Sequence, residues 1–403
     1  MKLHRSSSHR PLAVHPAVAL AAAVAVVGLL ASCGSAASRT SSATTSTVAA
    51  GQAGSATVTA PDEIGPYQVG RRTVTLDDAA HGRKIEADIW YPASPTAQGS
   101  PTRYSFLPNV FYDSKTALDA PPVAPGEAFP LVVYSHGSTG LRYVAAFFTE
   151  ALASHGFVVV SADHAGDTAT DAFTGTAIPV AQNAANRVET ANFLIDSMLT
   201  MNSTPGDPFE HTINPAEIGT TGHSFGGFTA IAAETGFANA VATIAADARI
   251  KAVAVMAPFS APIDDATLSN LNVPTMVVSG TRDTTTPIHP MTDRVWDLAT
   301  GRPMYRVDIT DAGHQSFSDV CFYQREFPTL ADVPQVLIDF VDQVAVSGCG
   351  PGILDVLRAQ KIVNTFVVSF LETELAHVPG YDAVLTTDGA AAYPEVTFSS
   401  KES

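Results

Sequence analysis

Hydrophobic and polar residues alternate in two neighbouring segments of the chain. Residues 69–76 (VGRRTVTL) and 84–91 (KIEADIWY) both show this period of two, and a short stretch containing Ala80, His81 and Gly82 lies between them. A period of two is typical of a β-strand with one buried face. The two segments therefore predict an antiparallel hairpin.

Further along the chain, short and mostly apolar runs alternate with longer segments whose apolar residues recur at helical spacing. The runs lie at residues 131–134, 157–162, 253–256, 275–280 and 304–309, and the helical segments at 143–155, 182–201, 225–235, 289–298 and 354–375. Apolar runs of this length are typical of parallel strands covered on both faces. The alternation predicts an α/β fold with a doubly wound, mostly parallel sheet and helices on both of its faces.

The start of the chain has the composition of an export signal. Lys2, Arg5 and Arg10 precede an apolar run at residues 17–30, which is short for a membrane span and typical of a signal peptide. Residues 30–33, Leu-Ala-Ser-Cys, at the end of this run resemble a bacterial lipobox. We interpret residues 1–32 as a lipoprotein-type signal peptide. Cys33 would then carry the lipid of an exported lipoprotein on the outer face of a bacterial cell membrane, with an ordinary secreted protein as the alternative.

Residues 33–61 are rich in Ser, Thr, Ala and Gly and contain almost no large apolar residues. Such a segment cannot bury a core, so we expect a flexible tether behind the lipid-bearing cysteine. Residues 62–403 show no second shift in composition and no internal repeat. We interpret them as a single α/β domain.

The formal net charge is −17, and loss of the signal peptide would remove three basic residues and no acidic one. An acidic surface disfavours nucleic acid and anionic headgroups, so we expect no nucleic-acid partner and membrane contact only through the lipid on Cys33. The other cysteines are Cys321 and Cys349. In an exported protein this pair predicts a disulfide, with two buried free thiols as the alternative.

The most informative motif is residues 222–227 (GHSFGG), which follow a β-prone run and open an Ala-rich helical run. In this context Ser224 is expected on a strained turn between a strand and a helix, where its hydroxyl projects from the sheet. The helix that starts there directs backbone N–H groups toward the same place. Ser224 is therefore the candidate nucleophile.

An acid and a histidine follow this serine, each just after one of the last two apolar runs: Asp283 and then His314. Serine, acid and histidine in this order, each at the C-terminal end of a strand, is the arrangement of the α/β-hydrolase fold. His314 would accept the proton of Ser224, and Asp283 would orient the imidazole. Asp264 and Asp265 also follow a strand and are the alternative acids.

A tetrahedral oxyanion on the substrate would need two preorganised donors. The Gly-containing turn at residues 135–140 (SHGSTG) follows an apolar run and can supply one of them. We predict that the N–H groups of Ser138 and Phe225 form the oxyanion hole. Phe225 and Phe317 are also candidates for contact with substrate, although aromatic residues of this kind more often belong to a core.

Asp163, His164, Asp167 and Asp171 gather after another predicted strand and could be interpreted as metal ligands. Their spacing fixes no three of them in one coordination geometry. Polar residues that cap a loop at the rim of the site are the better interpretation, and we predict neither a metal nor a cofactor.

With these residues in view, the chain resembles the α/β-hydrolases of the group that includes isoform II platelet-activating-factor acetylhydrolase and dienelactone hydrolase. More distantly, it resembles bacterial cutinase-like polyester hydrolases. The resemblance extends over about residues 130–319 and rests on four segments: 135–137, 152–158, 222–227 and 314–319.

The position of the acid separates the two branches of this group. In the acetylhydrolase branch the acid tends to follow the strand after the nucleophile helix, but residues 254–258 (AVMAP) contain no carboxylate. Asp283 takes that role instead, as in the dienelactone hydrolase branch. The resemblance therefore implies hydrolysis of carboxylic esters in general, on a small-molecule or lipid substrate.

Three other classes of function compete with a serine esterase. An acyltransferase would resolve the same acyl-enzyme with an alcohol, and a non-catalytic binding module would have no need of all three triad residues. A serine peptidase is disfavoured because no additional domain for gripping a peptide is visible. The combined pattern favours an esterase that works through an acyl-enzyme.

Overall fold

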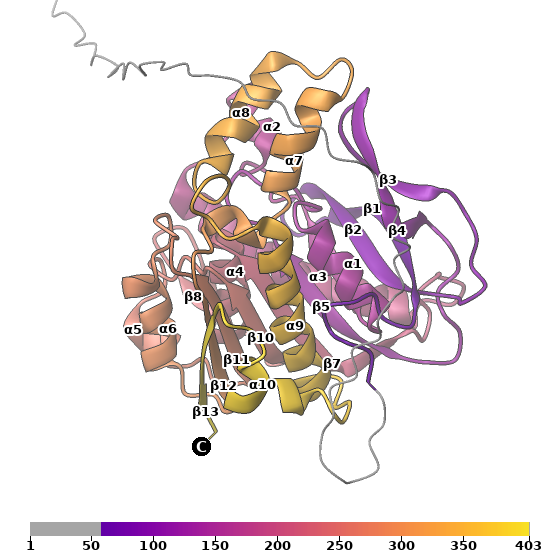
Figure 1. Ribbon diagram of the computed structural model, residues 1–403. Helices are drawn as coiled ribbons and strands as arrows, with labels where there is room; N and C mark the ends of the chain where they lie inside the picture. Colours follow the sequence, from indigo (N-terminus) through magenta and orange to yellow (C-terminus); the bar gives the residue numbers. More distant parts are fainter. Residues whose placement is uncertain (1–57, 403) are drawn as a thin grey trace, which may run out of the picture. The chain divides into compact units, whose positions relative to one another are not determined.

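The computed structural model describes residues 58–402, so the predicted signal peptide, Cys33 and most of the tether lie outside the described residues. Within this range, eleven strands form one mixed sheet (Figure 1). They span Gln68–Asp78 (β1), Arg83–Ala93 (β2), Pro101–Leu107 (β3), Val110–Asp119 (β4), Phe129–Ser135 (β5), Val158–Ala162 (β6), Ile213–His223 (β7), Ile250–Met256 (β10), Thr275–Gly280 (β11), Met304–Ile309 (β12) and Val396–Lys401 (β13). A two-stranded ribbon, Phe237–Ala238 (β8) with Thr243–Ile244 (β9), lies apart from this sheet.

The order across the sheet is β13-β12-β11-β10-β7-β5-β6-β2-β1-β4-β3. The six strands from β12 to β6 are parallel, and β13 and β2 pair antiparallel at the two ends of this block. Parallel neighbours place the loops that follow them at one edge of the sheet. The predicted doubly wound sheet and the β1–β2 hairpin are confirmed.

The helices span Ala146–Ser154 (α1), Ala169–Thr174 (α2), Val180–Ser203 (α3), Phe225–Thr235 (α4), Asp265–Leu268 (α5), Asp293–Leu298 (α6), Val320–Glu326 (α7), Gln335–Ala345 (α8), Val356–Glu374 (α9) and Thr387–Ala390 (α10). The helices α3 and α4 pack together on one face of the sheet, and α1 and α9 on the other (Figure 1). No helix within residues 58–402 is both long and apolar enough to cross a bilayer.

The strand β5 shows why its sequence is apolar throughout. Leu131 and Val133 belong to the core on the α3 and α4 side, whereas Val132 and Tyr134 belong to the core on the α1 and α9 side. Because successive side chains of a strand point to opposite faces, a strand covered on both faces has no polar face to show. The apolar run at residues 131–134 therefore indicated a central strand correctly.

The predicted helix at residues 289–298 begins later than expected. Pro290 follows His289, whose φ of −99° and ψ of 118° are extended. A proline excludes the helical conformation from the residue before it, so a regular helix cannot start there. An irregular turn at Ile288–Thr292 leads instead into α6.

The helices α7 and α8, joined through a short turn at Phe327–Thr329, form an additional layer that we call the cap (residues 320–345). Figure 1 shows the two helices beside α2, above the end of the sheet. The cap has an apolar cluster of its own, in which Tyr323, Phe327 and Val341 are buried with Val110 and Val144 from the main domain. The cap therefore packs against the main domain through a shared apolar core.

Candidate active site

Ser224 lies on a sharp turn between β7 and α4. Its φ of 58° and ψ of −119° are in a region that costs a non-glycine residue about 1–3 kcal/mol. Glycines on both sides allow the close approach that the turn requires. A Cβ on Gly222 would lie 2.4 Å from the carbonyl oxygen of Gly226, and a Cβ on Gly226 would lie 1.8 Å from that of Ser135. The strained turn predicted from the 222–227 motif is therefore present.

The His314 imidazole contacts both Ser224 and Asp283. Its Nε2 lies 2.9 Å from Ser224 Oγ, and its Nδ1 lies 2.7 Å from Asp283 Oδ2. All three side chains are buried. A hydroxyl on one nitrogen and a carboxylate on the other is the arrangement that allows an imidazole to accept a serine proton. The structure thus brings together the three residues selected from the sequence.

Asp283 is held as an ionised acceptor. The backbone N–H groups of Thr285 and Thr286 donate to Oδ1, each at 2.8 Å, and the Thr286 hydroxyl donates to Oδ2 at 2.9 Å. Burial by itself raises the pKa of Asp283, but the hydrogen bonds and charge of His314, together with the Thr286 donors, outweigh it and lower the pKa. The carboxylate therefore stays charged beside the imidazole.

The alternative acids have other partners. Asp264 accepts a hydrogen bond from the N–H of Thr267 at 2.9 Å and so caps α5. Asp265 pairs with Arg294 at 2.6 Å. In the described structure neither carboxylate contacts His314, so the geometry favours Asp283.

The turn after β5 passes close to the serine. A Cβ on Gly137 would lie only 3.3 Å from Ser224 Cβ, and Gly137 and Ser138 line the same cavity as the serine. Within residues 58–402 the backbone N–H groups of Ser138 and Phe225 donate to no protein acceptor. Two donors predicted for an oxyanion are thus left available at this turn and at the start of α4.

His223 supports His314 from the side. The two rings lie 4.6 Å apart between centroids. Burial and the neighbouring His314 lower the pKa of His223 to about 3, so its ring is neutral. A neutral ring can fix the position of His314 without placing a second positive charge beside it.

Ser224 and His314 face a cavity of about 280 Å³ below the cap. The sequence did not predict the cap side of this cavity. It is made by Val320, Tyr323, Phe327, Phe340, Val341 and Val344. Apolar residues at helical spacing in the segment 335–345 were the available signal, but they do not say what that helix covers.

The structure does not place Phe225 and Phe317 in this cavity, which corrects the predicted substrate contacts. Both side chains are buried. The ring of Phe225 lies 5.2 Å from that of Phe228 and 4.7 Å from the guanidinium of Arg187, so it belongs to the layer between α3 and α4. Phe317 belongs to the core on the α9 side of the sheet.

Cys321 and Cys349 form the predicted disulfide, with their Cα atoms 5.5 Å apart. Cys321 lies in the first turn of α7 and Cys349 lies shortly after α8, so the bond ties together the two ends of the cap. The N–H of His314 also donates to the carbonyl of Ser347 at 2.7 Å. The histidine loop and the base of the cap are therefore joined directly.

The acidic residues considered as metal ligands have protein partners instead. Asp163 accepts from the N–H of Arg142 at 2.8 Å, and Asp167 pairs with Arg187 at 2.6 Å. Asp171 takes part in the cap of α2. In the part of the chain that the structure describes, no three His, Cys, Asp or Glu side chains form a group that could hold a metal ion.

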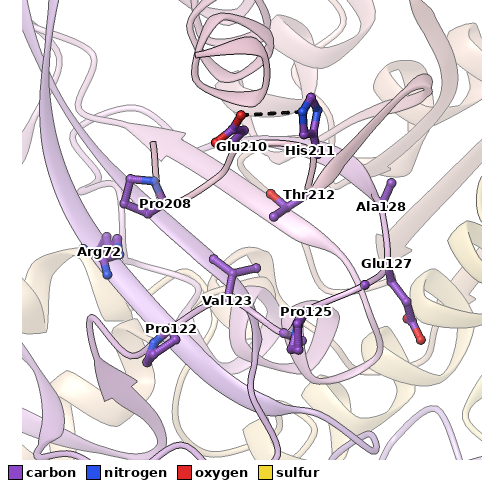
Figure 2. Close-up of a pocket in the computed structure, with 12 residues that line it drawn as sticks. Arg72, Pro122, Val123, Pro125, Glu127, Ala128, Pro208, Glu210, His211 and Thr212 are labelled. Carbon is purple, nitrogen blue, oxygen red and sulfur yellow. Dashed lines mark ion pairs between the residues drawn. The ribbon is translucent and has the colours of Figure 1, made fainter. Parts of the chain in front are cut away.

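A second cavity, of about 740 Å³, lies at the opposite edge of the sheet (Figure 2). Ala128 and Thr212, which line it, come just before β5 and β7, whereas the site described above follows those strands. Figure 2 shows Glu210 and His211 paired at its rim. His211 and Glu127 are exposed, so this cavity is an open surface depression.

The sheet order, the strained Ser224 turn and the Ser-Asp-His chain order together define an α/β-hydrolase. A family model described as PET hydrolase-like matches residues 121–321 of this α/β-hydrolase. A solved structure described as a ferulic acid esterase from Streptomyces cinnamoneus is similar to it with a TM-score of 0.61 and 23% sequence identity, over 85% of this chain and 98% of that one. No curated protein sequence matches significantly.

These similarities bear on the resemblance stated from the sequence. The PET hydrolase-like match agrees with its more distant part, the polyester hydrolases. The nearer resemblance to the acetylhydrolase and dienelactone hydrolase group stays a hypothesis.

Proposed function

We propose that this protein is a serine hydrolase that cleaves carboxylic esters through an acyl-enzyme intermediate. The observation that carries the proposal is the contact chain from Ser224 through His314 to Asp283, which opens into an apolar cavity. The matched family, described as PET hydrolase-like, and the similar structure, a ferulic acid esterase, both support action on esters.

In the first half of the proposed reaction, Nε2 of His314 takes the hydroxyl proton of Ser224 while Oγ forms a bond to the ester carbonyl carbon. The carbonyl oxygen becomes an oxyanion. When the tetrahedral intermediate collapses, the bond between carbon and the alcohol oxygen breaks. His314 then gives its proton to the departing alkoxide, which leaves as an alcohol.

In the second half, a water molecule attacks the acyl-enzyme. His314 takes one proton from the water, and the new oxyanion collapses with cleavage of the bond to Ser224 Oγ. The serine regains its proton from His314, and the carboxylic acid is released. Asp283 keeps its charge throughout and stabilises the imidazolium that forms in each half.

The oxyanion in both halves would accept hydrogen bonds from the N–H groups of Ser138 and Phe225. Both groups are without a protein acceptor in residues 58–402, as such a role requires. Removal of one donor from an oxyanion hole typically raises the barrier by about 3–4 kcal/mol.

The test is hydrolysis of p-nitrophenyl butyrate by the wild-type protein, combined with labelling by a fluorophosphonate and peptide mapping of the labelled residue. We expect turnover and a single label on Ser224. Adding an alcohol as acceptor and separating the products distinguishes hydrolysis from acyl transfer. Butyrate as the main product supports the proposal, whereas a butyrate ester as the main product would make the enzyme an acyltransferase.

We also propose that the enzyme works at the outer face of a bacterial membrane, held by a lipid on Cys33. The apolar run at residues 17–30 and the Leu-Ala-Ser-Cys sequence behind it support this location. Cys33→Ser is expected to abolish incorporation of a palmitate analogue during growth. A variant that starts at Asp62, isolated with the bond between Cys321 and Cys349 closed, should be free of the membrane and keep full esterase activity. An unlabelled wild-type protein in the medium would identify an ordinary secretion signal instead.

A further inference from the structure

The cap is the part of the site that lies beyond the PET hydrolase-like match. The match ends at residue 321, and the cap occupies residues 320–345. The cap nevertheless supplies one whole side of the cavity at Ser224. An effect of the cap on substrate selectivity therefore cannot be inferred from the family match and has to be argued from this chain.

The cavity below the cap is uncharged. None of the residues that line it is Asp, Glu, Lys or Arg. Phe106, Leu141 and Val144 face the cavity from the main domain, opposite the apolar side chains of the cap. A charge on a substrate would lose water there without gaining an oppositely charged partner from Asp, Glu, Lys or Arg, which is unfavourable.

The cavity is also small. Its volume of about 280 Å³ lies just below the range of about 300–1,000 Å³ for pockets that hold drug-sized ligands. The rings of Phe173 in α2 and Phe340 in α8 lie 4.6 Å apart between centroids, so the two helices meet near the cavity. Ala169 of α2 and Phe340 both line it. The contact between α2 and α8 therefore lies at the border of the cavity.

We propose that the cap makes this enzyme selective for small, uncharged esters whose aliphatic or aromatic group fills the cavity, and that it excludes polyester chains. This inference rests on the proposed ester hydrolysis. The cap side chains hold the apolar group of the ester, and the small volume of the cavity limits its length.

Two substrate comparisons test the selectivity of the wild-type protein. The first compares p-nitrophenyl hexanoate with mono-p-nitrophenyl adipate, which has the same chain length and ends in a carboxylate. We expect kcat/KM to be at least about a hundredfold higher for the hexanoate. The second compares p-nitrophenyl hexanoate with amorphous poly(ethylene terephthalate) film, from which we expect no release of terephthalate. Equal use of the adipate, or steady erosion of the film, would overturn the inference.

Variants on one helix then assign the selectivity to the cap. Val341 lines the cavity, whereas Val336 on the same helix is 62% exposed. Val341→Trp is expected to lower kcat/KM for the hexanoate by about tenfold relative to the acetate, because the new ring fills the cavity. Val336→Trp is the matched control and should leave this ratio unchanged. If Val341→Trp does not fold, Phe340→Ala should shift the preference toward longer esters.

The failure of this inference is distinguishable from that of the proposed function. Ester turnover and a labelled Ser224 without discrimination by charge, size or the Val341 substitution would reject only the role of the cap. A protein that cleaves no ester and takes up no label would reject the proposed function itself.

A second feature, independent of the cap, is a buried ion pair behind the turn after β5. The Arg187 side chain of α3 is fully buried, and its Nε and Nη2 donate to Asp167 Oδ2 at 2.9 and 2.6 Å. Arg187 also donates to the carbonyls of His136 at 2.7 Å and Gly137 at 3.2 Å. Asp167 Oδ1 accepts from the Ser138 hydroxyl at 2.7 Å.

These contacts set the direction of one predicted oxyanion donor. The carbonyl of Gly137 and the N–H of Ser138 belong to the same peptide group, and in a planar trans peptide they point in opposite directions. The N–H of Gly140 donates to the same carbonyl at 3.1 Å, and His136 Nδ1 lies 2.7 Å from its oxygen. Because these groups and Arg187 together hold the Gly137 carbonyl on the α3 side, the Ser138 N–H must point away from that side. We infer that Arg187 and Asp167 are positioning residues for the oxyanion hole.

Arg187→Lys keeps the positive charge but cannot bridge Asp167 and two carbonyls together. We expect kcat per fluorophosphonate-labelled site to fall by about tenfold to a hundredfold, with KM changed by less than about threefold. The Ki of a trifluoromethyl ketone, which places an oxyanion in the same hole, should rise by a similar factor. Asp167→Asn, which still accepts from Ser138, should show a smaller effect in the same direction.

Arg142→Lys is the matched control, because Arg142 pairs with Asp163 and does not contact the turn at residues 136–139. It should leave kcat per labelled site and the ketone Ki unchanged. If Arg187→Lys lowers only the melting temperature or the fraction of labelled sites, the pair supports the fold alone and the inference is overturned.

Discussion

Ser224→Ala is expected to lower kcat for p-nitrophenyl butyrate by about 10⁶ and to abolish labelling by a fluorophosphonate. The reason is geometric. Ser224 Oγ is the hydroxyl 2.9 Å from His314 Nε2, at the turn where the Gly137 backbone approaches. Progress curves with the purified variant, corrected for spontaneous hydrolysis, measure the first loss, and intact-protein mass spectrometry measures the second.

Ser203→Ala is the matched control, since this serine is exposed at the end of α3. Its neighbour Asn202 is hydrogen-bonded to Ile213 at the start of β7, whereas Ser224 follows the end of that strand. Its activity and labelling should equal those of the wild type. A label that persists in Ser224→Ala would move the nucleophile to another residue and remove the basis of the proposed function.

Asp283→Asn is expected to lower kcat by about 10³–10⁴. An amide at this position can offer an N–H to Nδ1 of His314, which favours the tautomer that presents a proton to Ser224 instead of accepting one. Fluorophosphonate labelling should slow by a comparable factor, because it depends on the same proton transfer. Steady-state kinetics at several pH values would measure the loss, and thermal unfolding would show whether the variant is folded.

Asp264→Asn and Asp265→Asn provide the comparison, since they make the same change at the two alternative acids. Asp264 caps α5, where asparagine caps as well as aspartate, and Asp265 pairs with Arg294 on the surface. Both variants should keep kcat within about twofold of the wild type. A larger kinetic loss in Asp264→Asn than in Asp283→Asn would reassign the acid.

The sequence was most informative where one local rule decides the structure. Residues 131–134 are apolar on both faces of a strand, which only a covered central strand requires, and β5 lies at that place. Gly222 and Gly226 flank Ser224 because the turn leaves no room for Cβ atoms at these two positions. The glycines of the motif therefore predicted the sharp turn of the backbone. Asp283 and His314 could be predicted because the residues that follow parallel strands lie at the same edge of the sheet.

The sequence was less informative where the outcome depends on distant packing. Phe225 is the first residue of α4, next to the nucleophile. Its contact with Arg187 of α3, which places the ring in the core, cannot be predicted from the sequence of α4. The spacing of the apolar residues in α8 predicts a helix with one apolar face. It does not predict which surface this face covers, because that surface lies on other elements. The outer strands β3, β4 and β13 were likewise not predicted, although β3 shows a period of two.

The bond between Cys321 and Cys349 has a practical consequence for anyone who prepares this enzyme. With the bond closed, the disulfide links the two ends of the cap to each other. With the bond open, the cap is held only by its two chain connections and its packing. Protein made in a reducing cytosol and protein exported through an oxidising compartment therefore differ in whether this bond holds the cap. Substrate profiles from different preparations become comparable once the free thiols of each have been counted.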